Sequence, residues 1–307
     1  MGTCGTKSVF EDARLEDFQI RSVIGKGRYG TVYEAVHRNS NVVLALKEIP
    51  KYHMLKTKQN DRKILSKLLD PFIANLHSAF ESTENVYLVL DYLSGCNLRE
   101  YLEKNPEISE IELQFVAACI IRALEYLNEK GVIHHDLKPE NLNFDINGYL
   151  ILTDFGLSHL VKNMTPSSSG TLLYMSPEVL YCQNYSNTAD IFALGVILFE
   201  IIEKTKPFPA GSRPELMNCY LYSKVKFTSQ SYGEDVIDFV NKCLIKNSEK
   251  RLGSAGFAEV KQHKWFSNFD WSKLEKFEMR SPCSNYKKNR PKRIKNFTKT
   301  LNIKITK

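Results

Sequence analysis

The sequence contains the run His134-His135-Asp136-Leu137-Lys138-Pro139-Glu140-Asn141, followed thirteen residues after Asn141 by Asp154-Phe155-Gly156. These polar side chains suit the transfer of a phosphoryl group. Asp136 can orient an attacking hydroxyl and accept its proton, and Lys138 can neutralise the phosphate as it transfers. Asn141 and Asp154 offer oxygen ligands of the kind that Mg²⁺ prefers. Either motif on its own could be a solvated acidic turn, so the interpretation depends on what accompanies them.

A glycine-rich segment precedes this run. Residues 25–32 fit the pattern G-x-G-x-x-G-x-V, with Gly25, Gly27, Gly30 and Val32 at the fixed positions. Glycines let a hairpin lie close over phosphates, with backbone N–H groups facing the oxygens. The pattern alone fits a structural turn as well as it fits phosphate binding. It is not a Walker A loop, because no Gly-Lys-Ser/Thr follows.

Lys47 lies in an apolar stretch, Leu44-Ala45-Leu46-Lys47, that we expect to be a strand. A lysine within an apolar run destabilises the fold unless it is paired. It could be an edge-strand lysine that points to water, but its distance from the glycine-rich segment favours contact with the α- and β-phosphates of a nucleotide. The four motifs in this order indicate a single site for ATP and Mg²⁺.

The chain is organised as a β-rich part followed by a helical part. Alternating apolar residues predict strands at 18–20, 31–33, 42–49 and 85–92, and helical spacing predicts helices at 58–69, 110–129, 190–203 and 234–245. We therefore expect an α+β fold with a smaller lobe at 18–92, a hinge near 91–94 and a helical lobe at 93–270, with a cleft between the lobes. Residues 1–17 and 271–307 are expected to flank them.

The bulk composition is that of an ordinary soluble protein. Of the 307 residues, 43% are hydrophobic and 25% charged. No apolar run reaches about 18 residues, so no transmembrane helix is expected. The seven cysteines form no C-x-x-C pair, which favours reduced thiols in the cytoplasm over disulfides or zinc.

The two ends of the chain suggest contact with a membrane. The formal net charge is +7, and residues 287–307 hold nine Lys or Arg and no acid, which leaves −2 for the rest. Met1-Gly2-Thr3-Cys4-Gly5-Thr6 fits a myristoylation signal at Gly2, with Cys4 open to palmitoylation. One myristoyl chain binds a membrane marginally, so Cys4 or the basic tail would supply the second signal. The alternatives are an unmodified terminus and a tail that is solvated or nuclear-targeting. No specific nucleic-acid binding is expected, because Phe297 is the one aromatic residue in the basic stretch 287–307.

From about Phe18 to Leu274 the sequence resembles the eukaryotic protein kinases. Lys138 after Asp136, and Thr171 before Tyr174, resemble serine/threonine rather than tyrosine kinases. Further segments resemble the AGC group: Leu68–Ile73, Asp91–Gly95, His263–Phe266 and Asp270-Trp271. Val9–Asp12 and Asp17-Phe18, with the acylation-type N-terminus, resemble the YANK branch.

The resemblance implies a monomeric serine/threonine kinase that transfers the γ-phosphate of Mg-ATP to protein substrates. Asp136 and Lys138 would be catalytic, and Asn141 and Asp154 would bind the metal. The nucleotide would be held by Ile24, Gly25, Gly27, Gly30, Val32, Ala45, Lys47, Asp61, Leu90, Asp91, Leu93 and Asn143. Among these, Leu90 would be the gatekeeper, and Asp91 and Leu93 would present hinge backbone to adenine. Glu178 and Arg251 would form a buried ion pair, although Arg251 could instead be a surface arginine.

Four positions depart from the family pattern. One of them, Phe192 in place of a tryptophan, is a change in packing, and the other three bear on activity. Asp61 stands where a glutamate pairs with Lys47, His135 stands where an arginine grips an activation-loop phosphate, and Asn143 puts a polar side chain under adenine. These departures motivate an alternative, an ATP-binding pseudokinase scaffold with little transfer. A small-molecule kinase is a further alternative, disfavoured by the peptide-positioning look of Gly170–Glu178.

The substrate preference is open at this stage. Glu140 and Glu200 match positions that attract basic substrate residues in some relatives. Asn97 replaces a third acid there, which argues against a basic preference.

Overall fold

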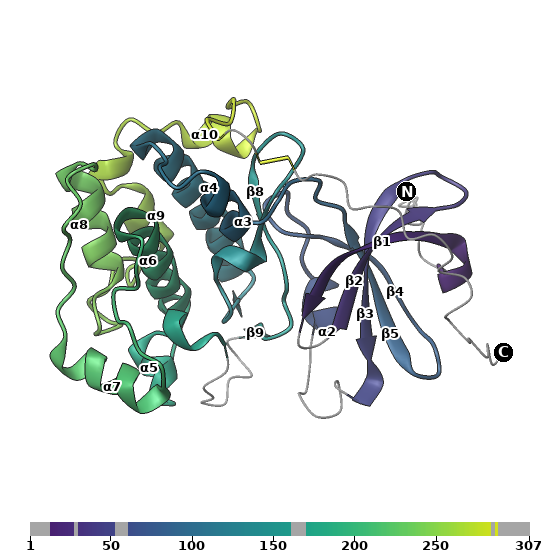
Figure 1. Cartoon of the computed structure of the whole chain (residues 1–307), viewed down its shortest axis with the longest axis horizontal. Helices are drawn as coiled ribbons and strands as arrows, with labels where there is room; N and C mark the ends of the chain where they lie inside the picture. Colours follow the sequence, from purple (N-terminus) through teal and green to yellow (C-terminus); the bar gives the residue numbers. More distant parts are fainter. Residues whose placement is uncertain (1–12, 28–29, 53–60, 161–169, 284–285, 288–307) are drawn as a thin grey trace, which may run out of the picture.

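The computed structural model describes residues 13–27, 30–52, 61–160, 170–283 and 286–287. A twisted antiparallel sheet forms one lobe, and a bundle of helices forms the other (Figure 1). The chain passes from the first lobe to the second after residue 91. The predicted α+β, two-lobed architecture is confirmed.

The sheet of the smaller lobe has five strands in the order β1-β2-β3-β5-β4. A short 3-10 helix, η1 (Leu15–Asp17), precedes the strands β1 (Phe18–Gly27), β2 (Gly30–His37), β3 (Val43–Pro50), β4 (Leu76–Glu81) and β5 (Asn85–Asp91). Cross-strand partners share a face of a sheet, and so do residues two apart on one strand. Val32 lies opposite Lys47, and Ala45 lies opposite Leu90. The register therefore places these four side chains on one face.

The opposite face of the sheet carries its own small core. Phe18, Leu46, Tyr87 and Val89 are at most 3% exposed and pack with Tyr33 and Leu44. Because the two faces alternate along each strand, burial of this set fixes the register and directs Lys47 the other way.

Helix α2 (Asp61–Leu65) is the helix described between β3 and β4. The sequence predicted a helix over 58–69, but the helix ends at Leu65. Lys67 N and Leu68 N bond to carbonyls three residues back, so the chain tightens into a turn before Asp70-Pro71. Ile64 and Leu65 join the large core shared with the helical lobe.

The helical lobe is built around α4 (Glu110–Glu129) and α6 (Thr188–Glu203). A capping box joins Ser109 and Glu112 at the start of α4, and Gly131 with φ +65° follows its end. The other helices are α3 (Leu98–Lys104), α5 (Pro177–Leu180), α7 (Arg213–Tyr222), α8 (Glu234–Cys243), α9 (Phe257–Lys261), η5 (Lys264–Phe266) and α10 (Trp271–Glu275). Within the described ranges, no helix combines the length and apolar character needed to cross a membrane.

Short strands flank the loops that bear the polar motifs at 134–141 and 154–156. β6 (Val132–Ile133) pairs with β9 (His159–Leu160), and β7 (Leu142–Phe144) pairs with β8 (Leu150–Leu152). The run at 134–141 lies between β6 and β7 and includes the 3-10 helix η2 (Pro139–Asn141), while Asp154 lies between β8 and β9. These two strand pairs bring the loop at 134–141 and the loop that contains Asp154 to the same place.

The predicted tail begins with a folded segment. Phe277 packs on Phe72 and Tyr149, at centroid distances of 4.9 and 4.4 Å. Tyr149 donates its hydroxyl to the carbonyl of Met279 at 2.7 Å, and Cys96 N donates to the carbonyl of Tyr286 at 2.8 Å. Residues 271–283 and 286–287 therefore return along the helical lobe to the segment that follows the hinge.

Candidate active site

The backbone of residues 134–141, which we call the catalytic loop, is held in place by Asp190. This buried carboxylate on α6 accepts from the backbone N–H of His134 at 2.8 Å and of His135 at 3.0 Å. His135 has φ +72°, a conformation that a non-glycine residue adopts at a cost of about 1–3 kcal/mol. Two hydrogen bonds to one carboxylate offset that cost and fix where the next residue, Asp136, points.

Asp136 lies at the centre of a small polar cluster. Its carboxylate accepts from Lys138 Nζ at 2.6 Å, from Thr171 Oγ1 at 2.7 Å and from Asn141 Nδ2 at 3.1 Å. Lys138 also donates to Thr171 Oγ1 at 3.0 Å. The cluster fixes the carboxylate in one orientation. In the sequence, Thr171 indicated a serine/threonine rather than a tyrosine kinase. Its contact with Asp136 joins residues 35 positions apart, and no local sequence pattern reveals it.

Lys47 crosses from the sheet to the second motif. Its Nζ lies 2.8 Å from Asp154 Oδ1, and the lysine is 8% exposed. Lys47 lowers the pKa of Asp154 to about 2 against the opposing effect of burial, so the carboxylate is ionised at neutral pH. β3 is an inner strand, so the interpretation of Lys47 as an edge-strand lysine is wrong.

The oxygens of Asn141 and Asp154 suit a hard divalent cation. Asn141 donates its amide to the carbonyl of Asp136 at 2.8 Å, which leaves Oδ1 as an acceptor. Oδ2 of Asp154 receives no hydrogen bond from the described residues, because Lys47 and Gly156 both bond to Oδ1. No cluster of three or more His, Cys, Asp or Glu suited to a metal occurs in the described ranges. This small donor set fits Mg²⁺, which keeps several waters and relies on phosphate oxygens for the rest.

The predicted nucleotide residues of the sheet lie together. Gly25 pairs with Val32, Val32 with Lys47, and Ala45 with Leu90. Gly27 pairs with Gly30 at the end of the hairpin, whose tip at 28–29 lies outside the described residues. Ile24 precedes Gly25 on the same strand. The register thus gathers the apolar and glycine residues expected around a nucleotide.

The hinge presents backbone rather than side chains. The carboxylate of Asp91 accepts from Asn75 N at 2.9 Å and approaches His77 Nε2 at 2.6 Å. Burial alone would raise the pKa of Asp91, but the hydrogen bonds from His77 and Asn75 outweigh it and lower the pKa. The N–H and C=O of Leu93 have no hydrogen-bond partner among the described residues. Leu93 can therefore offer both groups to a ligand.

A surface hollow of about 460 Å³ lies beside the hinge. Its lining includes Leu44, Leu93 and Ile151, but not Ala45 or Leu90. Successive residues on a strand face opposite sides, so this hollow is on the other side of the hinge from the predicted adenine position.

Two of the three departures that bear on activity have a structural account. Asn143 donates its amide to Thr153 Oγ1 at 3.1 Å, so the polar side chain under the predicted adenine position has a partner. His135 packs against the rings of Tyr185 and His159, at 4.6 and 5.4 Å between centroids. The side chain of Asp61 lies outside the described part of the structure, so the predicted Lys47–Asp61 pair stays a prediction.

The segment from Asp154 to Glu178 stands where protein kinases have their activation segment, and a buried ion pair fixes its end. Arg251 Nη1 lies 2.5 Å from Glu178 Oε1, and Nη2 lies 2.9 Å from Oε2. The two side chains are 0% and 5% exposed. The predicted pair is confirmed, and the alternative of a surface arginine is wrong.

The glycine-rich hairpin of β1 and β2, the inner-strand Lys47 bonded to Asp154, and the polar cluster around Asp136 are the features of a protein kinase domain. The chain belongs to the protein kinase domain family, whose model matches residues 18–266. Membership implies use of ATP together with a divalent metal.

Named relatives agree with this family. The chain is 36% identical to a probable serine/threonine-protein kinase of Dictyostelium discoideum over 87% of its own length and 60% of the relative. It is 34% identical to the serine/threonine-protein kinase sgk-1 of Caenorhabditis elegans, over 95% and 63%. It is 32% identical to the cAMP-dependent protein kinase catalytic subunit of Dictyostelium discoideum, over 85% and 41%. These relatives include members of the AGC group. The chain spans about 60% or less of the length of most of them, and the YANK branch stays a prediction.

Proposed function

We propose that the protein is a serine/threonine kinase that transfers the γ-phosphate of ATP, with Mg²⁺, to hydroxyls of protein substrates. The observation that carries the proposal is the joint placement of Asp136 and Lys138 with the Lys47–Asp154 pair. Each group has the partner that holds it in a defined place. A pseudokinase scaffold would not need this arrangement around Asp136.

The catalytic roles follow from the contacts. Asp136 is held by Thr171 and Asn141 so that its carboxylate can accept the proton of an incoming hydroxyl. Lys138, 2.6 Å from Asp136, is placed to neutralise charge on the transferring phosphoryl group. Lys47 would bind the α- and β-phosphates. A bound Mg²⁺, held by Asn141 and Asp154, would neutralise and orient the phosphates.

The choice of serine or threonine is supported by Thr171. Its hydroxyl bridges Lys138 and Asp136, at 3.0 and 2.7 Å. These two bonds connect the catalytic loop to the activation segment. They leave the carboxylate of Asp136 beside the stretch Gly170–Glu178, which would position the substrate. A short aliphatic hydroxyl would reach it in this arrangement.

The proposal is tested with the purified chain, labelled ATP, Mg²⁺ and a mixture of proteins. We expect label in phosphoserine and phosphothreonine, and none when EDTA removes the metal. Label only in phosphotyrosine, or in a small molecule, would contradict the proposed substrate class. ATP binding without transfer would establish the pseudokinase alternative.

We also propose, from the sequence alone, that this protein is a cytoplasmic monomer and that it associates with membranes. Gly2, Cys4 and the basic tail from residue 288 lie outside the described residues. An N-myristoylated chain should sediment with vesicles containing phosphatidylserine, and Gly2→Ala should reduce bound protein roughly tenfold or more. Equal sedimentation of both proteins would contradict a role for Gly2.

A further inference from the structure

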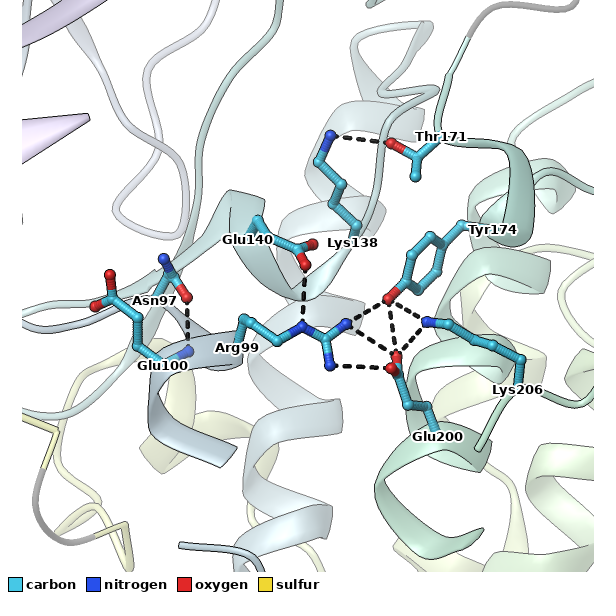
Figure 2. A network of polar contacts seen from close by, with 9 residues as sticks. All are labelled: Asn97, Arg99, Glu100, Lys138, Glu140, Thr171, Tyr174, Glu200 and Lys206. Carbon is cyan, nitrogen blue, oxygen red and sulfur yellow. Dashed lines mark hydrogen bonds and ion pairs between the residues drawn. The ribbon is translucent and has the colours of Figure 1, made fainter. Parts of the chain in front are cut away.

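Arg99 joins two carboxylates beside the predicted reacting groups (Figure 2). Its Nε donates to Glu140 Oε1 at 3.0 Å, and its Nη1 donates to Glu200 Oε1 at 2.9 Å. Nη2 reaches Glu200 Oε2 at 3.3 Å and the hydroxyl of Tyr174 at 2.8 Å. The three charged residues come from α3, η2 and α6, so tertiary packing alone brings them together.

Lys206 completes the cluster on the far side of Glu200. Its Nζ lies 2.6 Å from Glu200 Oε2, donates to the hydroxyl of Tyr174 and sits 3.8 Å from the centre of that ring. Both oxygens of Glu200 are therefore engaged. Burial raises the pKa of Glu200, but hydrogen bonds from Arg99 and Lys206 outweigh it and lower the pKa. With two cations and two carboxylates, the cluster of Arg99, Lys206, Glu140 and Glu200 has no net charge.

This charge-balanced cluster adjoins the place where a substrate must lie. Glu140 sits in η2 between Lys138 and Asn141, and Tyr174 ends the 3-10 helix η4 (Leu172–Tyr174), which starts directly after Thr171. Lys138 Nζ donates to Thr171 Oγ1 at 3.0 Å, and Figure 2 draws this pair together with the cluster. An extended chain advances about 3.3 Å per residue, so substrate residues within about three positions of the acceptor hydroxyl come within reach of the cluster.

The cluster remains open to such a chain. The side chains of Glu140 and Arg99 are 43% and 29% exposed. Oε2 of Glu140 accepts no hydrogen bond from the described residues. Without Arg99, the two carboxylates would attract a lysine or arginine of the substrate. With Arg99 in place, the protein itself supplies the guanidinium that a basic substrate would bring.

The local structure shows that Arg99 is not there to support its helix. It lies in the first turn of α3, where the helix dipole disfavours a cation. Asn97, the N-cap, accepts from Glu100 N at 2.9 Å and adds no negative charge beside the cluster. The carboxylates of Glu140 and Glu200 therefore hold Arg99 in place.

We propose that Arg99 is a specificity-determining residue that closes this acidic site from within. The protein then has no preference for a basic residue where the substrate faces the cluster, because Arg99 already occupies the two carboxylates and a substrate cation gains nothing there. This inference rests on the proposed kinase function, and it goes further by naming the substrate chemistry and the residue that sets it.

The test uses serine peptides in which each of the four positions on either side of the acceptor is in turn alanine or arginine. For the wild type, we expect kcat/KM for arginine and alanine peptides to agree within about twofold at every position. For Arg99→Gln, which leaves one excess negative charge, the arginine peptide should gain roughly tenfold at one or two adjacent positions, the size of one charge-assisted hydrogen bond. Arg99→Gln with Lys206→Gln leaves two excess charges and should gain more.

Matched variants separate specificity from structure. Arg99→Lys keeps a cation in the cluster and should keep the flat preference. Arg122→Gln removes another arginine that contacts two carboxylates. Arg122 lies on α4, 3.0 Å from Asp70 and 3.9 Å from Glu275. This variant should also leave the preference flat. Thermal unfolding of each variant shows that the fold is retained.

Two results would overturn the inference. A wild type that already prefers arginine roughly tenfold, with the preference lost in Glu200→Gln, would show that Arg99 swings aside for the substrate. An Arg99→Gln protein with unchanged preference would show that Arg99 only braces α3 against α6. If the wild type transfers no phosphate, the proposed function fails, and peptide affinity by fluorescence anisotropy decides the inference by the same comparison.

Discussion

Replacing Asp136 by asparagine should lower phosphoryl transfer about 100- to 10,000-fold, the usual contribution of a positioned general base. The substitution keeps the size of the side chain but removes the carboxylate that can accept a proton. It also places an amide N–H₂ near Lys138 and Thr171, which both donate hydrogen bonds to the carboxylate of Asp136 in the wild type. The variant should still bind ATP, because Lys47, Asn141 and Asp154 are unchanged.

The measurement is kcat for labelled phosphate transfer, with nucleotide affinity determined separately on the same protein. Loss of kcat with nearly constant ATP affinity marks a group used in the transition state. Asp270→Asn is a matched control: Asp270 caps α10 through Lys273 N, a role that asparagine fills equally well. It should leave transfer unchanged. Retention of full transfer by Asp136→Asn would remove Asp136 as the base.

The two lobes and the phosphoryl-transfer chemistry could be predicted from the sequence, because local patterns of residues indicate both. Period-two alternation located β2, β3 and β5, and Lys47 could be singled out because a lysine in an apolar strand demands a partner. The partner that the structure shows, Asp154, is 107 residues away. The order of the motifs placed both residues in one site, but the partner predicted for Lys47 was Asp61. The buried pair of Glu178 and Arg251 was likewise predictable from the resemblance to a family.

The arrangement around Arg99 could not be predicted in this way. Glu200 is 101 residues from Arg99, and their contact depends on how α3 packs beside α6. The sequence suggested Glu140 and Glu200 as an open acidic pair, and nothing in the local pattern marked Arg99 as its counter-charge. Two other contacts could not be predicted for the same reason: the hydrogen bond of Thr171 to Asp136 and that of Cys96 N to the carbonyl of Tyr286. Tertiary packing determines both, and no hydrophobic period or turn signal in the sequence indicates them.

Replacing Arg251 by methionine should lower the free energy of unfolding by about 3–5 kcal/mol, the range seen when one partner of a buried ion pair is removed. Methionine fills much of the arginine volume, so the loss reports mainly on charge and hydrogen bonding. Glu178 would be left buried without its counter-ion. The carbonyls of Thr188 and Ile245 would also lose the donors that now lie 2.9 and 2.8 Å away.

Urea unfolding followed by tryptophan fluorescence suits this prediction, because Trp265 and Trp271 both belong to the helical lobe that contains the pair. Arg14→Ala is the control, since Arg14 is 77% exposed and lies 3.9 Å from Glu16; its effect should stay within about 0.5 kcal/mol. The double variant Arg251→Met with Glu178→Leu should recover much of the stability, because apolar replacement of a whole buried pair is often neutral. It should not recover transfer, because the end of the activation segment would no longer be held through Glu178. A single Arg251→Met protein within 1 kcal/mol of the wild type would show that Glu178 finds another partner or becomes protonated, and that the pair does not anchor this segment.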